Sequence, residues 1–530
     1  MGISRRALIG RIGMAGGFGA AFAAMQGLGL VSSAAAAPFD GPPPTVGQGK
    51  RVLVLGAGIA GLVLTYELER AGFEVRLLEA RRRVGGRNWT IRGGDRVELI
   101  GEADQTAGFS EGHYFNAGPA RIPSLHQGLL GYCKTLGVPL EVEVNSSRSA
   151  LMQSDAAFGG RPVRLRQAVN DLRGELSALL AKASNRGALD LDLTPDDKAR
   201  LVDFLKSYGD LSPSLTYAGS ERSGYSRLPG AASQTGVAVA PLPLSELLKA
   251  DTLPSVLFED NVLMQATMFE PVGGMDQIPR ALAGAIRSPI VLGAEVRSIR
   301  QSADEAAVTW RDAATGALNR ETADYVVVTV PLPVLARVET DFSPSVKSAI
   351  SGAVYDFAAK VAFEAPRFWE AEDIYGGLSF PSGGTGPVWY PSTGFGSPRG
   401  ILIGAYVVQA PAQAFEALPL ADQIARARAA VERLHPGHGG DLASPVVVDW
   451  NRAPFNLGPW IHWPEDGPQA AAFRLLNQPE GRVYFSGAHL SQLPSWQEGA
   501  VLAAHRTIGL LADRARADQL ATIANQRGTQ

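Results

Sequence analysis

The chain has 530 residues, with 49 lysines and arginines against 52 aspartates and glutamates, which gives a formal net charge of −3 at pH 7. This length exceeds a single hydrophobic core and predicts two or three domains. The mixed charges offer no basic surface for nucleic acid. Cys133 is the single cysteine, which excludes an internal disulfide and a cysteine-rich metal cluster, and we expect no metal. Its place in the helical run GLLGYCKTLG predicts a buried residue.

The first 37 residues are typical of an export signal. Arg5 and Arg6 form a twin-arginine pattern, which precedes a weakly apolar run over residues 14–30 and then four consecutive alanines. The alternative, a transmembrane anchor, is disfavoured by the glycine content and the alanine-rich end. We predict Tat export, cleavage near Ala36, and a periplasmic or secreted protein without a stable membrane anchor. Replacing both arginines by lysine should retain the protein in the cytoplasm, and unchanged export in a fractionation assay would contradict this prediction.

A strand, a glycine-rich turn and a helix follow one another from residue 51 to residue 70. The apolar strand 51–55 leads directly into Gly56-Ala-Gly58-Ile-Ala-Gly61. In such a turn Gly56 permits the sharp bend, Gly58 allows the backbone to approach a pyrophosphate, and Gly61 allows close packing of helix and strand. The free N–H groups of the helix N-terminus then bind phosphate.

A second strand, 74–78, ends on Glu79, about 20 residues beyond the glycines, where a carboxylate accepts hydrogen bonds from ribose hydroxyls. The strand, turn, helix and acid together predict a site for an adenosine-diphosphate moiety. The alternative is a glycine-rich turn that serves only steric needs, and the surrounding pattern disfavours it.

The stretch from residue 51 to residue 87 resembles the flavin-containing amine oxidase superfamily, and most of all bacterial L-amino acid oxidases. The resemblance rests on the glycine turn together with Arg81 and the basic loop Gly85-Gly86-Arg87, which in that family lies along the FAD diphosphate. It extends over essentially the whole chain after the export signal. The implied positions of cofactor contact are Gly56, Gly58, Ile59, Ala60, Gly61, Glu79, Ala80, Arg81, Gly86, Arg87, Gly118, Pro119, Ala120, Arg121, Val296, Gly487, Ala488, Trp496, Gln497 and Ala500.

The resemblance implies an α/β and α+β fold, with a Rossmann-like FAD-binding domain of the p-hydroxybenzoate-hydroxylase type, a mixed-sheet substrate domain and a helical insertion. The FAD-binding domain is discontinuous because the buried strand at 324–330 lies far along the chain from the first strand. The implied boundaries are 1–37 for the signal; 47–118, 262–330 and 446–515 for the FAD domain; 119–140 and 331–445 for the substrate domain; and 141–261 for the insertion.

Two helices, 167–184 and 194–208, are predicted within the insertion, and Thr194 is a suitable start for the second. The Gly-, Ser- and Pro-rich stretch 217–243 predicts a long loop, and such loops often cover active sites. After the insertion we expect a glycine turn at 272–279 that leads into a helix. Strands are then predicted at 290–292, 296–299 and 308–310, with the family's adenine contact at the position of Val296.

Arg121 lies in the turn AGPARIP, residues 117–123. By itself an arginine is usually a solvated surface residue. In L-amino acid oxidases and their decarboxylating monooxygenase relatives, however, the matching arginine grips the substrate α-carboxylate beside the flavin. A guanidinium suits this role because it donates two parallel hydrogen bonds to a carboxylate. His126, close by, has no placed partner in the sequence, and we expect a structural role for it.

Lys360 lies in a predicted strand within 355–369, among apolar neighbours. Burying an ammonium is costly without a partner, and the alternative is an edge lysine that reaches solvent. In the family the matching lysine contacts flavin N5 through water. The stretch VWYP then resembles the region whose tyrosine gives the carboxylate a second contact, which implies that role for Tyr390; an ordinary strand aromatic is the alternative.

The C-terminal part predicts a strand that enters a turn at 481–487, followed by the stretch 493–500, which opens a long helix to about Arg514. The positive helix N-terminus would face the flavin pyrimidine, and the resemblance places Trp496 against the substrate. Ala488 stands where the family usually has an acid, which removes one expected FAD hydrogen bond. No cysteine lies in this turn, so FAD is expected to be non-covalent.

The resemblance implies oxidative deamination of L-amino acids by FAD and O2 to 2-oxo acids, ammonia and hydrogen peroxide, with Arg121, Tyr390, Lys360 and Trp496 as catalytic residues. Three alternatives stay open. A monoamine or polyamine oxidase shares the flavin motifs, and a decarboxylating 2-monooxygenase shares even Arg121. A flavin-binding protein without activity, marked by Ala488, is the third. The expected partners are an amino acid, as a small-molecule substrate, and O2; a homodimer is one alternative for the oligomeric state.

Overall fold

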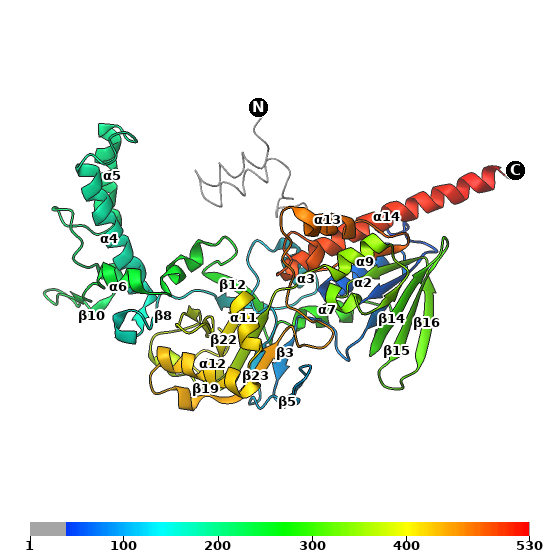
Figure 1. Cartoon of the computed structure of the whole chain (residues 1–530), viewed down its shortest axis with the longest axis horizontal. Coiled ribbons are helices and arrows are strands. Elements are labelled where there is room, and N and C mark those ends of the chain that lie inside the picture. The colour runs from blue at the N-terminus through cyan, green and yellow to red at the C-terminus, as the bar shows by residue number, and fades with distance from the viewer. Residues whose placement is uncertain (1–38, 529–530) are drawn as a thin grey trace. The chain divides into compact units, whose positions relative to one another are not determined.

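The computed structural model describes residues 39–528, with side chains described to residue 520 (Figure 1). The predicted export signal at residues 1–37 lies outside the described residues. The chain divides into two compact units, the first made of Met1–Val142, Met268–Ala358 and Val448–Gln530, and the second of Glu143–Thr267 and Ala359–Val447. Across residues 39–528 no helix is both long enough and apolar enough to cross a bilayer.

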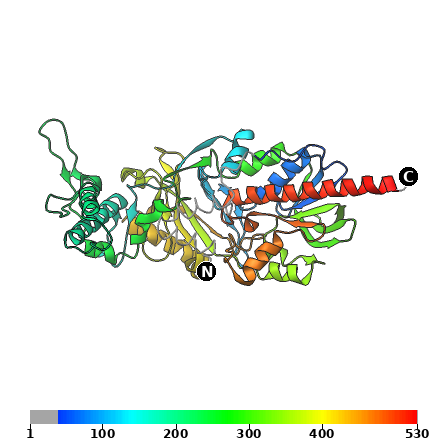
Figure 2. The ribbon, with the colours of Figure 1, turned by 90° about the horizontal axis from the view of Figure 1, so that it is seen from above.

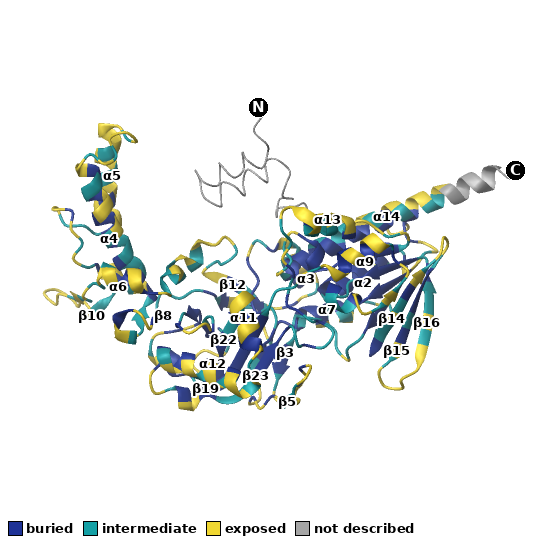
Figure 3. Cartoon of the chain, in the orientation of Figure 1, coloured by how far each residue is buried: buried dark blue, intermediate teal, exposed yellow. Residues whose placement is uncertain are grey.

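The first unit is built on a five-stranded sheet with the order β13-β2-β1-β17-β24. All neighbouring strands in it are parallel, and the middle of the sheet is buried (Figure 3). Strands buried on both faces are uniformly apolar, which is why the Val- and Leu-rich runs predicted them correctly. The five strands are β1 (Arg51–Leu55), β2 (Glu74–Glu79), β13 (Ile290–Leu292), β17 (Tyr325–Val328) and β24 (Val483–Phe485).

Two helices that are distant in sequence, α2 (Ile59–Arg70) and α14 (Gln497–Gly528), contribute to one hydrophobic core of this unit. Figure 2 shows α14 as one continuous helix. It extends well past the predicted end at Arg514 because no glycine or proline interrupts the sequence between there and Gly528. An ion pair one turn apart, from Arg514 Nε to Asp518 Oδ1 at 3.0 Å, spans the predicted end.

The first unit also holds a four-stranded sheet in the order β16-β15-β14-β18. The strands predicted at 296–299 and 308–310 are present in it and are longer than expected. They form an antiparallel pair joined by a short turn, so the ladder continues beyond the apolar residues. The four strands are β14 (Ala294–Gln301), β15 (Ala306–Asp312), β16 (Leu318–Ala323) and β18 (Glu339–Thr340).

Two segments that the sequence assigned to the substrate domain belong to the first unit instead, residues 119–140 and 331–358. The first contains α3 (Gln127–Thr135), whose N-terminus is capped from α14: Glu498 accepts hydrogen bonds from Gly128 N at 2.9 Å and Leu129 N at 2.7 Å. Cys133 of this helix is buried, as predicted. The second contains α9 (Pro344–Ser351), which packs into the core around β17 and β24. These long-range contacts give no local signal in the sequence.

The second unit contains a five-stranded sheet in the order β20-β21-β22-β19-β23. Its strand β19 is buried along nearly its whole length and carries Lys360, so the strand predicted there is confirmed. Helices α11 (Gln409–Glu416) and α12 (Leu420–Leu434) contact β22. The strands are β19 (Ala358–Pro366), β20 (Leu378–Ser379), β21 (Val388–Trp389), β22 (Arg399–Val408) and β23 (Ala443–Asp449).

The insertion within the second unit contains both predicted helices, α4 (Leu165–Asn185) and α5 (Pro195–Tyr208). Thr194 caps α5, since its Oγ1 accepts a hydrogen bond from Asp197 N at 3.2 Å. The stretch 217–243 is more ordered than a plain loop. It contains the short helix η2 (Glu221–Ser223) and a hairpin of β10 (Tyr225–Arg227) and β11 (Val237–Ala238). Helix α6 (Leu244–Lys249) and η3 (Leu253–Asp260) complete the insertion.

Asp171 ties this stretch to α4. Its Oδ1 accepts from Tyr217 Oη at 2.5 Å and Ser223 Oγ at 2.6 Å, and its Oδ2 accepts from Leu242 N at 2.8 Å. Because the carboxylate is fully buried, we expect Asp171→Ala to destabilise the second unit by about 2–3 kcal/mol through its unpaired donors.

Urea unfolding and limited proteolysis of residues 217–243 would measure this effect. The matched control is Asp203→Ala on α5, where the carboxylate is largely exposed and pairs only with Lys206. Equal protease resistance of the two variants would contradict the role assigned to Asp171.

Candidate functional site

The glycine turn between β1 and α2 has the geometry predicted for binding a pyrophosphate. Gly56 has a φ of +102°, a left-handed conformation that favours glycine. A Cβ on Gly61 would lie 1.9 Å from Gly56 O, so this position requires the close helix–strand contact. Gly58 is the N-cap of α2, and no side chain caps this helix. A Cβ on Gly58 would meet no atom within 4 Å. The turn therefore leaves an open face at a helix N-terminus.

Glu79 lies at the end of β2, directly beside this turn. Its Oε2 accepts from Ala57 N at 2.7 Å and its Oε1 from Arg81 N at 2.8 Å, and the side chain is buried. These bonds hold the carboxylate at the carboxyl end of the sheet, where ligands of open α/β sheets bind. The contact with a ribose stays a prediction.

Three arginines, Arg81, Arg83 and Arg87, gather after β2, and Arg81 Nη1 pairs with Glu79 Oε1 at 3.9 Å. Burial lowers the pKa of each of them, and burial together with the charge of Arg81 lowers the pKa of Arg83 to about 9. Arg81 donates to Pro454 O and to Asn456 Oδ1, and Arg87 donates to Pro459 O. Such a concentration of partly desolvated positive charge fits an anionic ligand, and a diphosphate has the appropriate charge. The sequence prediction did not include Arg83, although the run RRR could have suggested it.

Three segments that are far apart in sequence meet beside this turn. Asn88 Nδ2 donates to Gln497 Oε1 at 2.5 Å and lies 3.5 Å from Met275 O, while Gln497 Nε2 contacts Met275 Sδ at 3.5 Å. The basic loop, the glycine turn before α7 (Gln277–Ala285) and the start of α14 are thus joined within one unit. Asn88 was missed in the sequence because an asparagine after a glycine loop reads as an ordinary turn residue.

Arg121 is buried, with 8% of its surface exposed, so it is not the solvated surface arginine of the alternative interpretation. Its neighbour Ile122 forms a β-bridge with Phe269, with N–O distances of 2.7 and 2.9 Å, which fixes the backbone here. His126, also buried, makes a T-shaped contact with Trp496, with ring centroids 5.0 Å apart. Trp496 directly precedes α14, so the start of this helix and the segment that follows Arg121 lie together in the first unit. Substrate contact by Arg121 and Trp496 stays a prediction.

Burial disfavours the charged form of three histidines of the first unit, of which His126 and His489 are buried and His505 is half-buried. Burial lowers the pKa of His126 and His505 to about 4, and burial with the nearby charge of Arg87 and Arg506 lowers that of His489 to about 3. In the unfolded chain a histidine has a pKa near 6.5. The unfolded state therefore binds more protons below pH 6.5, and the free energy of unfolding should fall as the pH falls from about 6.5 to about 4.

His126→Phe tests this pH dependence. Nε2 of His126 has no hydrogen-bond partner, so a phenyl ring loses no bond there and can keep the edge contact with Trp496. We expect the variant to lose about 1.4 kcal/mol less per pH unit than the parent between pH 6 and 4.5, as measured by urea unfolding. Parallel curves for the parent and the variant would contradict a neutral His126.

In the second unit Lys360 is buried against two aromatic rings rather than reaching solvent. Its side chain is 3% exposed, and Nζ lies 5.4 Å from the ring centroid of Trp389 and 4.9 Å from that of Tyr406. Both distances are within the range of a cation–π contact. Tyr406, on β22, was missed in the sequence, since only the packing of β22 beside β19 reveals its position.

The structure does not bring Tyr390 to this group. Tyr390 directly follows β21, which ends at Trp389, and its side chain bonds to other segments of the second unit. Its hydroxyl donates to Ser379 Oγ at 2.9 Å and lies 2.7 Å from His435 Nε2. Burial raises the pKa of Tyr390. Its substrate role stays a prediction, and the geometry favours Tyr406 as the tyrosine beside Lys360.

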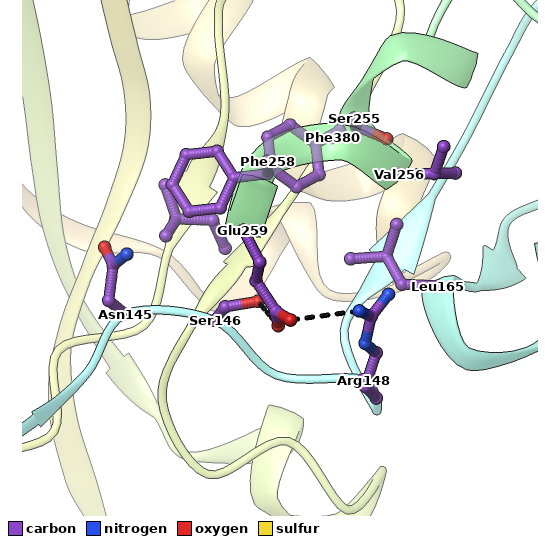
Figure 4. Close-up of a pocket in the computed structure, with 10 residues that line it drawn as sticks. Asn145, Ser146, Arg148, Leu165, Ser255, Val256, Phe258, Glu259 and Phe380 are labelled. Carbon is purple, nitrogen blue, oxygen red and sulfur yellow. Dashed lines mark hydrogen bonds and ion pairs between the residues drawn. The ribbon is translucent and has the colours of Figure 1, made fainter. Parts of the chain in front are cut away.

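A small cavity of the second unit is lined by charged and apolar side chains (Figure 4). Its volume is about 10 Å³, which holds about one water molecule and excludes a substrate. Arg148 Nη2 pairs with Glu259 Oε2 at 2.9 Å, and Ser146 Oγ donates to the same carboxylate. The cavity is lined by Asn145, Ser146, Arg148, Leu165, Ser255, Val256, Phe258, Glu259, Leu378 and Phe380. In the part of the chain that the structure describes, no group of three His, Cys, Asp or Glu side chains could hold a metal.

The parallel sheet, the open glycine turn and the arginine cluster together define a dinucleotide-binding protein. The family model described as flavin containing amine oxidoreductase matches residues 59–507, and the chain belongs to this family. The resemblance read from the sequence is thereby confirmed, and a flavin is the cofactor that the family implies.

Among curated proteins the chain is 30% identical to a flavin-dependent L-tryptophan oxidase of Lentzea aerocolonigenes, over 87% of this chain and 98% of that protein. It is 26% identical to an L-amino-acid oxidase of Siganus canaliculatus, over 87% and 85%. Among solved structures, cyclohexylamine oxidase from Brevibacterium oxydans has a TM-score of 0.58 at 17% identity, covering 88% of this chain and 99% of that chain. Putrescine oxidase bound to putrescine gives 0.56 at 19%, covering 87% and 98%. The solved structures support the predicted fold.

Proposed function

We propose that this protein is an FAD-dependent L-amino acid oxidase. The observation that carries the proposal is the buried Arg121, which lies in the same unit as the glycine turn and the arginine cluster. An amine without a carboxylate needs no such guanidinium, whereas an α-carboxylate does. The similarity to a tryptophan oxidase and to L-amino-acid oxidases supports the same substrate class.

The residues of the first unit fit FAD. The open face at Gly58 and the guanidinium groups of Arg83 and Arg87 would hold the diphosphate, and Glu79 the ribose. Ala488, buried in the short helix η5 (Ala488–Leu490), offers neither an acid nor a thiol, so the cofactor is held without a covalent bond. Flavin should then appear in the supernatant after acid precipitation, and flavin that remains with the denatured protein would contradict this.

Bound FAD supplies a two-electron acceptor that O2 reoxidises to give hydrogen peroxide. Arg121 holds the carboxylate and orients the Cα–H, which makes the transfer nearly unimolecular. Trp496 packs against the substrate. In the family the lysine that matches Lys360 contacts flavin N5 through water, and in this protein Tyr406 lies beside Lys360. One amino acid, one O2 and one water yield a 2-oxo acid, ammonia and hydrogen peroxide.

The reaction products test the proposal directly. Purified holoprotein would be incubated with each of the twenty L-amino acids, their D-isomers and common amines, and peroxide, ammonia and carbon dioxide would be measured. Peroxide and ammonia in equal amounts from L-amino acids are the expected result. An amide with carbon dioxide would identify a decarboxylating monooxygenase, and turnover of amines alone would identify an amine oxidase.

The site of action is part of the same proposal. The twin arginines at positions 5 and 6 support export of the folded protein by the Tat route, with the cofactor inserted before transport. The mature enzyme then acts in the periplasm or outside the cell.

A further inference from the structure

Glu143 is a buried carboxylate of the second unit that none of the roles above uses. It is 1% exposed. Its Oε1 accepts a hydrogen bond from Trp389 Nε1 at 2.8 Å, and its Oε2 accepts one from Ser392 N at 3.1 Å. Both donors favour the ionised form of the carboxyl group. These two hydrogen bonds hold the carboxylate at the N–H edge of the Trp389 indole.

Trp389 connects this carboxylate to Lys360. The indole is 2% exposed, with its N–H edge on Glu143 and the Lys360 ammonium over the ring, 5.4 Å from the centroid. Tyr406 provides a second ring, 4.9 Å from the same ammonium and 6.4 Å from the indole. The Glu143 carboxylate, the Trp389 indole and the Lys360 ammonium therefore contact one another in that order, and all three belong to the second unit.

Two effects make the indole more than a spacer. An indole that donates its N–H to an anion gains electron density in the ring, which strengthens its attraction for a cation. The negative charge of Glu143 also favours the charged form of a nearby lysine in this poorly solvated region. Both effects favour the ammonium form of Lys360 at its place over the indole ring.

We propose that Glu143 is a positioning residue which, through the indole of Trp389, fixes the Lys360 ammonium in place. This proposal rests on the proposed function, in which Lys360 serves the flavin N5 position. It adds a requirement for the function of Lys360, because both the Glu143 carboxylate and the Trp389 indole must be present to hold the ammonium in position.

Glu143→Gln removes the charge and keeps one of the two hydrogen bonds. Trp389→Phe keeps a ring under the ammonium and removes the N–H. Glu364→Gln is the matched control, because Glu364 is an equally buried acid on the same strand as Lys360, but its partner is Arg399 at 2.8 Å. Four residues along a strand separate it from Lys360 by about 13 Å.

The first measurement is the pH dependence with which an amine-selective acetylating reagent labels Lys360 in the holoprotein, read by peptide mass spectrometry. Only the neutral amine reacts. We expect Glu143→Gln and Trp389→Phe to move the midpoint of labelling to lower pH, by about one pH unit for the first. Glu364→Gln should leave the midpoint unchanged.

The second measurement is the rate at which O2 reoxidises the holoprotein after reduction by dithionite. No amino acid is needed, so the experiment remains informative if the proposed substrate class is wrong. We expect Glu143→Gln to slow reoxidation about fivefold. The same change made in the Trp389→Phe background should have little further effect, since the path through the indole is already broken.

A midpoint and a reoxidation rate in Glu143→Gln that match the parent or the Glu364→Gln control would overturn the proposal. So would full additivity of Glu143→Gln and Trp389→Phe. Should Glu143→Gln fail to fold, Trp389→Phe decides alone, and parental values for that variant would equally overturn it.

Discussion

Arg121→Ala is expected to lower kcat/KM for L-amino acids by about 100- to 1,000-fold, because a bidentate pair between guanidinium and carboxylate contributes about 3–4 kcal/mol. Most of the loss should appear as a higher KM, since the pair is made with bound substrate as well as in the transition state. The buried position of Arg121 strengthens this expectation, because a carboxylate left without its partner there cannot be compensated by bulk water. Steady-state peroxide assays with an L-amino acid measure the effect.

Arg121→Lys is the matched control for this variant. It keeps the positive charge but cannot donate two parallel hydrogen bonds, so it should recover only part of the activity. The amine that corresponds to the amino acid without its carboxylate should be turned over at the same rate by the parent, Arg121→Ala and Arg121→Lys. Unchanged kinetics of Arg121→Ala on amino acids would remove Arg121 from the substrate site.

Gly58→Ala and Gly61→Ala should separate cofactor binding from folding. The Cβ at position 58 meets nothing within 4 Å, and the residue has an ordinary φ of −74°, so the apoprotein should keep its stability to within about 0.5 kcal/mol. FAD affinity should nevertheless fall about 10- to 100-fold, since the methyl group occupies the space into which the diphosphate must come.

Gly61→Ala should instead destabilise the unit that binds the cofactor. Its Cβ would lie 1.9 Å from Gly56 O, and the neighbour is backbone that cannot turn aside. We expect a loss of about 3 kcal/mol of apoprotein stability, by urea unfolding, together with the loss of FAD binding. FAD fluorescence titration completes the comparison. Normal FAD affinity in Gly58→Ala would show that the diphosphate does not lie over this turn.

The elements that bear the cofactor turn were predictable because their signals are local. The runs around Leu53 and Val327 are uniformly apolar, as in parallel strands buried on both faces, and the glycines at 56, 58 and 61 each meet a steric need within a few residues. The strand that carries Lys360 was predicted for the same reason.

The residues that were missed depend on contacts between distant segments. Asn88 meets Gln497 across 409 positions of sequence, and no local pattern marks that pairing. Tyr390 directly follows β21 and Tyr406 lies on β22, and only the packing of β22 beside β19 shows that Tyr406 is the tyrosine next to Lys360. The predicted domain assignment differs from the structure at 119–140 and 331–358. Helices in these segments are held by other parts of the first unit, such as Glu498 on α14.

The central claim is that an α-carboxylate held by Arg121 brings a substrate to the flavin. Anaerobic mixing of the holoprotein with L-phenylalanine and, separately, with phenethylamine tests it most directly, because the two molecules differ only in that carboxylate. We expect L-phenylalanine to bleach the flavin absorbance and phenethylamine to leave it unchanged. Equal or faster bleaching by phenethylamine would contradict it.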